Sequence, residues 1–239
     1  MVKVFIDAGH GGSDPGAVGN GLKEKDITLK IAKRVDELLK EYQNVQTKMS
    51  RTGDTYPSLT DRTNEANNWG ANFLLSIHIN AGGGNGYEDY VYPDSTNSIA
   101  YQNIIHAEII KKIGQMGNRG KKQANYHMLR ESNMPSILTE CGFIDNSSDA
   151  ALLKQDAFIE GLAQGHVNGL VKSFGLIKKE VGGVTEEKIV LTPGQKNAFD
   201  KLVKHGLMAA DYEVKDSVDI RLITMLAPLL TKLETKGSL

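Results

Sequence analysis

The sequence predicts an α/β fold: a mainly parallel sheet with helices on both faces, followed by a small helical C-terminal domain. Short runs of residues that are apolar on both faces alternate with longer segments of helical periodicity, a pattern typical of strands covered by helices on each side. After Gly175 this alternation stops and a charged, glycine-containing segment begins. The first observation predicts the sheet, and the second predicts a separate C-terminal part.

Four short apolar runs are the predicted strands. The third and fourth show little polar alternation, which favours central positions in the sheet. The four runs lie at 2–6, 45–50, 73–79 and 136–139.

Helices are expected between and after these strands. Ser58 followed by Asp61 has the spacing of a capping box and opens a predicted helix that reaches Trp69. The other helices are predicted by apolar residues that recur every three or four positions, and Gly175 ends the last one. These stripes lie at 27–42, 99–116 and 158–174.

The C-terminal part has its own helix signals. Thr192 stands before Pro193, with Gln195 two positions further on, which predicts a helix start; this helix is expected to end near 205–206. A second helix is expected from about Asp216. The predicted division of the chain is therefore a large domain (1–176), a linker (177–190) and a small helical domain (191–239).

Composition excludes several classes of protein. Of 239 residues 40% are hydrophobic, enough for a core, and 28 basic against 29 acidic side chains give no basic footprint for nucleic acid. The single cysteine, Cys141, excludes an internal disulfide framework, and we expect it to be a small buried residue. No apolar run approaches the roughly 18 residues of a membrane helix. The N-terminus lacks a signal-peptide pattern, so synthesis in the cytoplasm is expected.

Two histidines follow predicted strands. His10 comes directly after the first strand, and His78 lies near the end of the third. The carboxyl ends of parallel strands converge on one rim, so the two imidazoles are expected to meet although 68 positions separate them. Glu24, just before the first helix, lies on the same rim. Two histidines, a carboxylate and an open fourth position form the ligand set of hydrolytic zinc sites.

A second carboxylate, Glu140, ends the strand at 136–139. It is placed to act as the base for water at such a zinc site.

Three ordered segments resemble the type 3 family of zinc-dependent N-acetylmuramoyl-L-alanine amidases. They contain His10, His78 and Glu140 in turn, and the resemblance, which includes Glu24 and Ser50-Arg51-Thr52-Gly53-Asp54, extends from residue 2 to about 174. The segments are FIDAGHGGSDPG at 5–16, ANFLLSIHINA at 71–81 and LRESNMPSILTECGFI at 129–144.

The resemblance implies a zinc amidase domain with a twisted, mostly parallel six-stranded sheet. It implies that His10, Glu24 and His78 bind one Zn²⁺ and that Glu140 is the general acid/base. The implied substrate is bacterial peptidoglycan, cut by zinc-activated water at the amide between N-acetylmuramic acid and the L-alanine of the stem peptide.

Several hypotheses about the biological role remain open. A wall hydrolase without a secretion signal resembles a phage endolysin released through a holin-type pore, which we favour, or a sporulation or mother-cell autolysin that acts on lysis. A zinc peptidase cutting within the stem peptide is a nearer chemical rival. A non-catalytic wall-binding protein is disfavoured, because such a protein is expected to lack one of the four site residues, and all four are present.

No substrate-binding residue is assigned from the sequence. His127 is a candidate for substrate contact, whereas His106, His166 and His205 are expected to be structural or exposed. Arg51 and Arg62 either grip a stem-peptide carboxylate or tie a helix to a loop, and we favour the second interpretation. The C-terminal domain is expected to bind a wall polymer or, through its leucine stripe at 222–233, another copy of the chain.

Overall fold

The structure, a computed structural model, describes residues 1–179 and 193–204. Contacts between Cα atoms divide the chain into two units, Met1–Lys179 and Glu180–Leu239. In the second unit the described residues form one helix, α7 (Pro193–Lys204), where the first C-terminal helix is predicted. The second predicted C-terminal helix and the leucine stripe lie outside the described residues, and the predicted domain boundaries remain a prediction.

The first unit is built on a six-stranded sheet with the order β4-β1-β5-β8-β6-β7. Every neighbouring pair is parallel except β6 with β8, which is antiparallel. The mostly parallel sheet is therefore confirmed. Its strands are β1 (Val2–Ala8), β4 (Val45–Met49), β5 (Phe73–Asn80), β6 (Tyr87–Val91), β7 (Asn118–Gln123) and β8 (Ser136–Phe143).

Two strands, β6 and β7, were not predicted from the residue pattern. The strand β7 is an edge strand with the sequence NRGKKQ, so it has no apolar run to reveal it. The strand β6 is mostly buried but contains Glu88 and Asp89, whose charges hid it. The strand β8 also extends past the predicted end at 139, so Glu140 lies within the strand.

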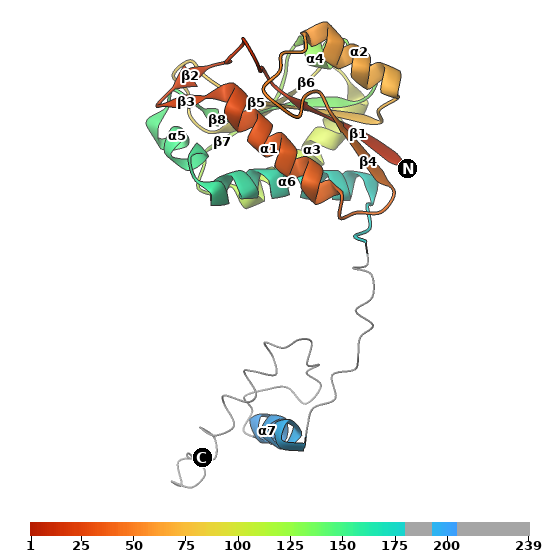
Figure 1. The fold of residues 1–239 in the computed structure, drawn as a ribbon, viewed down its shortest axis with the longest axis vertical. Coiled ribbons are helices and arrows are strands. Elements are labelled where there is room, and N and C mark those ends of the chain that lie inside the picture. Colours follow the sequence, from red (N-terminus) through yellow and green to blue (C-terminus); the bar gives the residue numbers. More distant parts are fainter. Residues whose placement is uncertain (180–192, 205–239) are drawn as a thin grey trace. The chain divides into compact units, whose positions relative to one another are not determined.

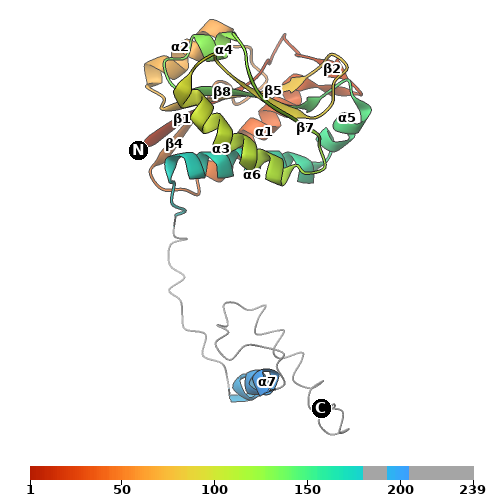
Figure 2. The same ribbon diagram turned by 180° about the vertical axis from the view of Figure 1, so that it is seen from behind.

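Helices cover both faces of this sheet, as predicted. Figure 1 shows α2 (Leu59–Trp69) and α4 (His127–Arg130) on one side, and α1 (Glu24–Leu39) and α6 (Asp156–Phe174) on the other. In Figure 2, seen from behind, α3 (Thr96–Lys112) lies beside α6. A short hairpin, β2 (Val18–Gly19) with β3 (Leu22–Lys23), precedes α1, and α5 (Ser147–Leu153) follows β8. None of the described helices is long and apolar enough to cross a membrane.

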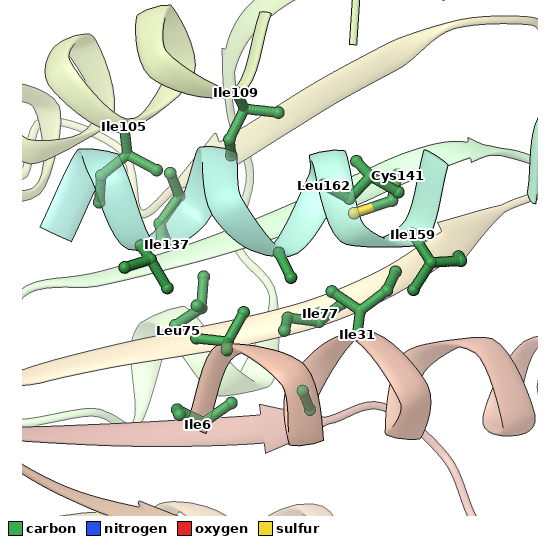
Figure 3. Packing of buried hydrophobic residues seen from close by; sticks show 14 of the residues in the cluster. Ile6, Ile31, Leu75, Ile77, Ile105, Ile109, Ile137, Cys141, Ile159 and Leu162 are labelled. Atoms are coloured by element: carbon green, nitrogen blue, oxygen red, sulfur yellow. The ribbon is translucent and has the colours of Figure 1, made fainter. Parts of the chain in front are cut away.

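The two faces of the sheet differ in chemistry. The face toward α1, α3 and α6 is the main apolar core, where Ile6, Ile77 and Ile137 meet helix residues such as Ile31 and Leu162 (Figure 3). Because side chains alternate along a strand, Asp7, His78 and Glu140 project to the opposite face. That face has a smaller apolar cluster under α2 and α4, which includes Phe5, Leu74 and Met128. The polar site residues thus occupy the less covered face.

The predicted capping box at the start of α2 is confirmed. The Ser58 hydroxyl accepts a hydrogen bond from the Asp61 backbone N–H at 3.2 Å, and the Asp61 carboxylate accepts from the Ser58 backbone N–H at 3.1 Å. The helix ends at Gly70, whose φ of 68° is left-handed.

Two glycines allow α6 to pack closely on α3. A Cβ atom at Gly165 would lie 2.7 Å from the Ile109 Cα, and one at Gly169 would lie 2.7 Å from the Ile105 Cα. Gly161, one turn earlier, has its nearest such contact at 3.4 Å.

We expect Gly169→Ala to lower the free energy of unfolding by about 1–3 kcal/mol, because the methyl group meets backbone that cannot yield. The matched Gly161→Ala variant should raise it by up to about 1 kcal/mol through helix propensity. Urea unfolding of the full chain measures both. Equal effects of the two substitutions would contradict the close-packing account.

Candidate metal centre

Three side chains converge beyond the carboxyl ends of β1 and β5. His10 lies two residues after the end of β1, His78 lies in β5, and Glu24 is the first residue of α1. Each offers a ligand atom, and these atoms all lie within 4.8 Å of one another. The structure therefore brings together the three residues that the sequence proposes as metal ligands.

The carboxylate of Glu24 is the centre of this cluster. Its Oε1 lies 3.1 Å from His10 Nε2 and 2.9 Å from His78 Nδ1. Backbone N–H groups of Ile79 and Ala17 donate to Oε1 and Oε2, at 2.9 and 2.8 Å. Burial opposes ionisation of Glu24, but the hydrogen bonds and charges of the two imidazoles hold its pKa well below the usual value. Glu24 is thus an ionised carboxylate in a nearly buried position.

The orientation of the His10 ring is fixed by Asp14. His10 Nδ1 lies 2.8 Å from Asp14 Oδ2, while Asp14 Oδ1 accepts a hydrogen bond from the Gly16 backbone N–H at 3.0 Å. With Nδ1 bonded to a carboxylate, Nε2 is the atom presented to Glu24, an arrangement common among metal-binding histidines. Burial lowers the pKa of His10, but Glu24 and Asp14 outweigh this and raise it to about 9. Asp14 is not among the site residues predicted from the sequence, where its spacing of four residues after His10 is the available signal.

Glycines make room for the rings. A Cβ atom at Gly9 would lie 2.4 Å from the His78 ring, and one at Gly16, whose φ is 66°, would lie 2.6 Å from Glu24 Oε2. Such distances are too short for any larger residue, so the cluster requires glycine at both positions. His10 itself has a left-handed φ of 61°, which is uncommon outside glycine.

Two buried arginines hold the strained loop after β1. Arg62 pairs with Asp7 at 2.8 Å and also donates to the carbonyl oxygens of Ala8 and His10. Arg51 donates to the carbonyl oxygens of Ala8 and Gly9. The favoured interpretation, that these arginines tie helix to loop, is confirmed.

Glu140 lies beside His78 across adjacent strands. The two residues are register partners in the β5–β8 pair. The Oε2 atom of Glu140 is buried and has no hydrogen-bond partner among residues 1–179 and 193–204. Burial raises the pKa of Glu140 to about 7. The negative charges of Glu24 and Glu88 also raise this pKa, whereas the charge of His78 lowers it. A half-buried carboxyl that titrates near neutrality is suited to both accepting and donating a proton.

The other candidates lie apart from the cluster. His127 begins α4, and its Nε2 lies 3.4 Å from the Thr63 hydroxyl. His106 bonds Asp89 and His166 bonds the Leu162 carbonyl, both within the protein interior, as expected of structural residues. Cys141 is fully buried, and burial raises the pKa of its thiol, which agrees with a packing role. His205 lies outside the described residues.

The donor set fits a zinc ion. Two imidazole nitrogens and one carboxylate oxygen are the ligands of hydrolytic zinc sites, and their mutual distances allow one ion to contact all three. The carboxylate–histidine contact at Asp14 supplies the outer support that such ligands usually have.

Comparison with known proteins gives a consistent result. Residues 4–172 match the family described as N-acetylmuramoyl-L-alanine amidase. The chain is 56% identical over 191 residues to a sporulation-specific N-acetylmuramoyl-L-alanine amidase of Bacillus subtilis, covering 79% of this chain and 74% of that protein. It is 44% identical over 191 residues to an endolysin of Bacillus phage SPP1, covering 77% and 70%.

A solved structure shows the same fold. The catalytic domain of CwlV, an N-acetylmuramoyl-L-alanine amidase from Bacillus (Paenibacillus) polymyxa, is 35% identical, with a TM-score of 0.69, covering 72% of this chain and 97% of that one. The CwlD amidase from Clostridioides difficile, solved in complex with the GerS lipoprotein, is 28% identical with the same TM-score, covering 73% and 99%.

The Asp14–His10 contact generates a prediction about metal affinity. Asp14→Asn should weaken zinc binding about 10- to 100-fold, because it removes the charge that orients and polarises the imidazole. Competition with a chromophoric chelator measures the affinity. Asp54→Asn is the control, since Asp54 anchors the Gly12 backbone N–H of the same loop but contacts neither histidine. A loss of equal size in the control would assign the effect to the loop.

The raised pKa of Glu140 generates a second prediction. Between pH 4.5, the usual pKa of a glutamate, and about pH 7, Glu140 is protonated in the folded protein but ionised in the unfolded chain. The free energy of unfolding therefore falls as the pH rises through this range. In metal-free protein, Glu140→Gln removes this penalty. The variant should exceed the wild type by about 3 kcal/mol in free energy of unfolding at pH 8 and match it at pH 4. A difference that does not change with pH would contradict the shift.

Proposed function

The chain belongs to the N-acetylmuramoyl-L-alanine amidase family, and we propose that it hydrolyses the amide between N-acetylmuramic acid and the L-alanine of the peptidoglycan stem peptide, using zinc held by His10, Glu24 and His78. The observation that carries the proposal is the geometry: a His–Glu–His cluster around the buried Glu24, beside Glu140, whose Oε2 has no hydrogen-bond partner among the described residues. Peptidoglycan is accordingly the proposed macromolecular partner.

The roles of the residues follow from their positions. Zinc, when bound, supplies a Lewis acid that polarises the scissile carbonyl and makes water more acidic. Glu140 accepts the proton of the attacking water at its unpartnered Oε2. It then donates that proton to the departing alanine nitrogen, which leaves as a neutral amine rather than an amide anion. In the metal-free protein, burial raises the pKa of Glu140 toward neutrality, which favours a carboxyl that can both accept and return a proton.

The proposed biological role is lysis of a bacterial cell wall. Of the two lytic roles, phage endolysin is the one we favoured from sequence, and the similarity to the SPP1 endolysin supports it. The higher identity to a sporulation-specific amidase favours mother-cell lysis as a second candidate. Accumulation of the protein after prophage induction, or instead at the onset of sporulation, distinguishes them. For the C-terminal region, binding to a wall polymer or to another copy of the chain is retained as a proposal.

The chemistry is tested by digestion of purified walls. The wild type should release stem peptides with a free L-alanine amino terminus and leave intact glycan, and a chelator should stop the reaction. Glu140→Gln should reduce turnover by at least about 10³-fold with zinc still bound, whereas His78→Ala should lose the metal. New amino termini within the stem peptide would support the zinc peptidase instead. Activity retained by the Glu140 variant would overturn its assigned role.

A further inference from the structure

A row of charged side chains continues from the metal centre across the open face of the sheet. His78 on β5 is the register partner of Glu140 on β8, and Glu140 is the partner of Glu88 on β6. Residues directly opposite on neighbouring strands project to the same face. Glu88 therefore lies one strand beyond Glu140, away from the metal ligands.

The carboxylate of Glu88 is buried and accepts hydrogen bonds from two cationic side chains, although it carries only one negative charge. Asn80 Nδ2 and Tyr90 Oη donate to its Oε1, at 2.8 and 2.7 Å. Arg119 Nε and Lys122 Nζ, both from β7, donate to its Oε2, the former at 2.6 Å. Two cations on one carboxylate leave a net charge of +1 at this end of the row.

Arg119 is held in one orientation by Glu88 and Phe143. Its guanidinium carbon lies 4.8 Å from the centre of the Phe143 ring, and its Nε is occupied by Glu88. Within the described part of the chain, its two terminal nitrogens have no hydrogen-bond partner, and 36% of the side chain is exposed. A planar, pre-oriented guanidinium with free terminal nitrogens is suited to bidentate binding of a carboxylate.

Three cations on the other side of the metal centre are already neutralised or buried. Arg62 pairs with Asp7, and Lys25 pairs with Asp54. Arg51 is buried with its donors on backbone carbonyl oxygens and the Thr28 hydroxyl. These three cations are therefore not available to a ligand, whereas the terminal nitrogens of Arg119 lie free on the β7 side of Glu140 within the described residues.

We propose that Arg119, supported by Lys122, binds a carboxylate on the peptide portion of the substrate, so that the stem peptide lies across β6 and β7 and the glycan lies toward His10. The inference rests on the proposed function. The lactyl carboxyl of the muramic acid forms the scissile amide, so it carries no negative charge. The stem peptide is the part that carries free carboxylates, and it is the part that a cationic fork recognises.

The test uses two N-acetylmuramoyl dipeptides in which the residue after L-alanine has an uncharged side chain. This residue ends in either a free α-carboxylate, which is the only carboxylate of the substrate, or its primary amide. Zinc-loaded full-length wild type, Arg119→Gln and Arg119→Lys are compared on both. Lys121→Gln is the matched control, because Lys121 neighbours the cation pair in sequence but bonds Asn103. Kinetic constants and zinc content are measured for each variant.

Arg119→Gln should lower kcat/KM for the carboxylate substrate about 10- to 100-fold, mainly through KM, and change it less than about threefold for the amide. Arg119→Lys should recover part of the loss, and Lys121→Gln should match the wild type. An equal loss on both substrates would show that Arg119 only neutralises Glu88 and would overturn the inference. If the wild type cleaves neither muramoyl–alanine bond, the proposed function itself fails.

Discussion

The bonding of the Glu24 carboxylate between two imidazoles is the interaction on which the rest of the site depends. Its Oε1 faces His10 Nε2 and His78 Nδ1 while backbone N–H groups hold both oxygens. This arrangement requires the ends of β1 and β5 and the first residue of α1 to meet at one point. A parallel β1–β5 pair brings the two strand ends together, because neighbouring strands that run in one direction end at the same edge.

One face of the sheet supplies the apolar core of the domain, and the other face holds the polar residues of the site. Apolar residues facing α1, α3 and α6 form the main core, so burial there supplies most of the folding free energy. The opposite face accepts features that oppose stability: a left-handed His10 and a buried Glu140 Oε2 without a hydrogen-bond partner among the described residues. Such costs concentrate where function requires fixed polar groups.

The sequence predicts the central strands and the histidines at their carboxyl ends. Apolar runs located the central strands, and the residues at their carboxyl ends, His10 and His78, could be expected to meet. Asp14, which orients His10, is not singled out by the sequence, because a carboxylate four residues after a histidine is too common a spacing to identify a partner. The residue pattern does not predict β7, which is polar throughout, or β6, in which the charged Glu88 and Asp89 interrupt the apolar residues. The hydrogen bonds that satisfy Glu88 come in part from Arg119, which is distant in sequence, so a local pattern does not reveal them.

One metal ion is expected to bind where the side chains of His10, Glu24 and His78 meet. Anomalous X-ray scattering at the zinc absorption edge, from crystals of the zinc-loaded chain, locates the ion directly. We expect one strong peak in contact with His10 Nε2, His78 Nδ1 and the Glu24 carboxylate, on the side open to Glu140. A peak at other residues, or none in protein that is active, would contradict it.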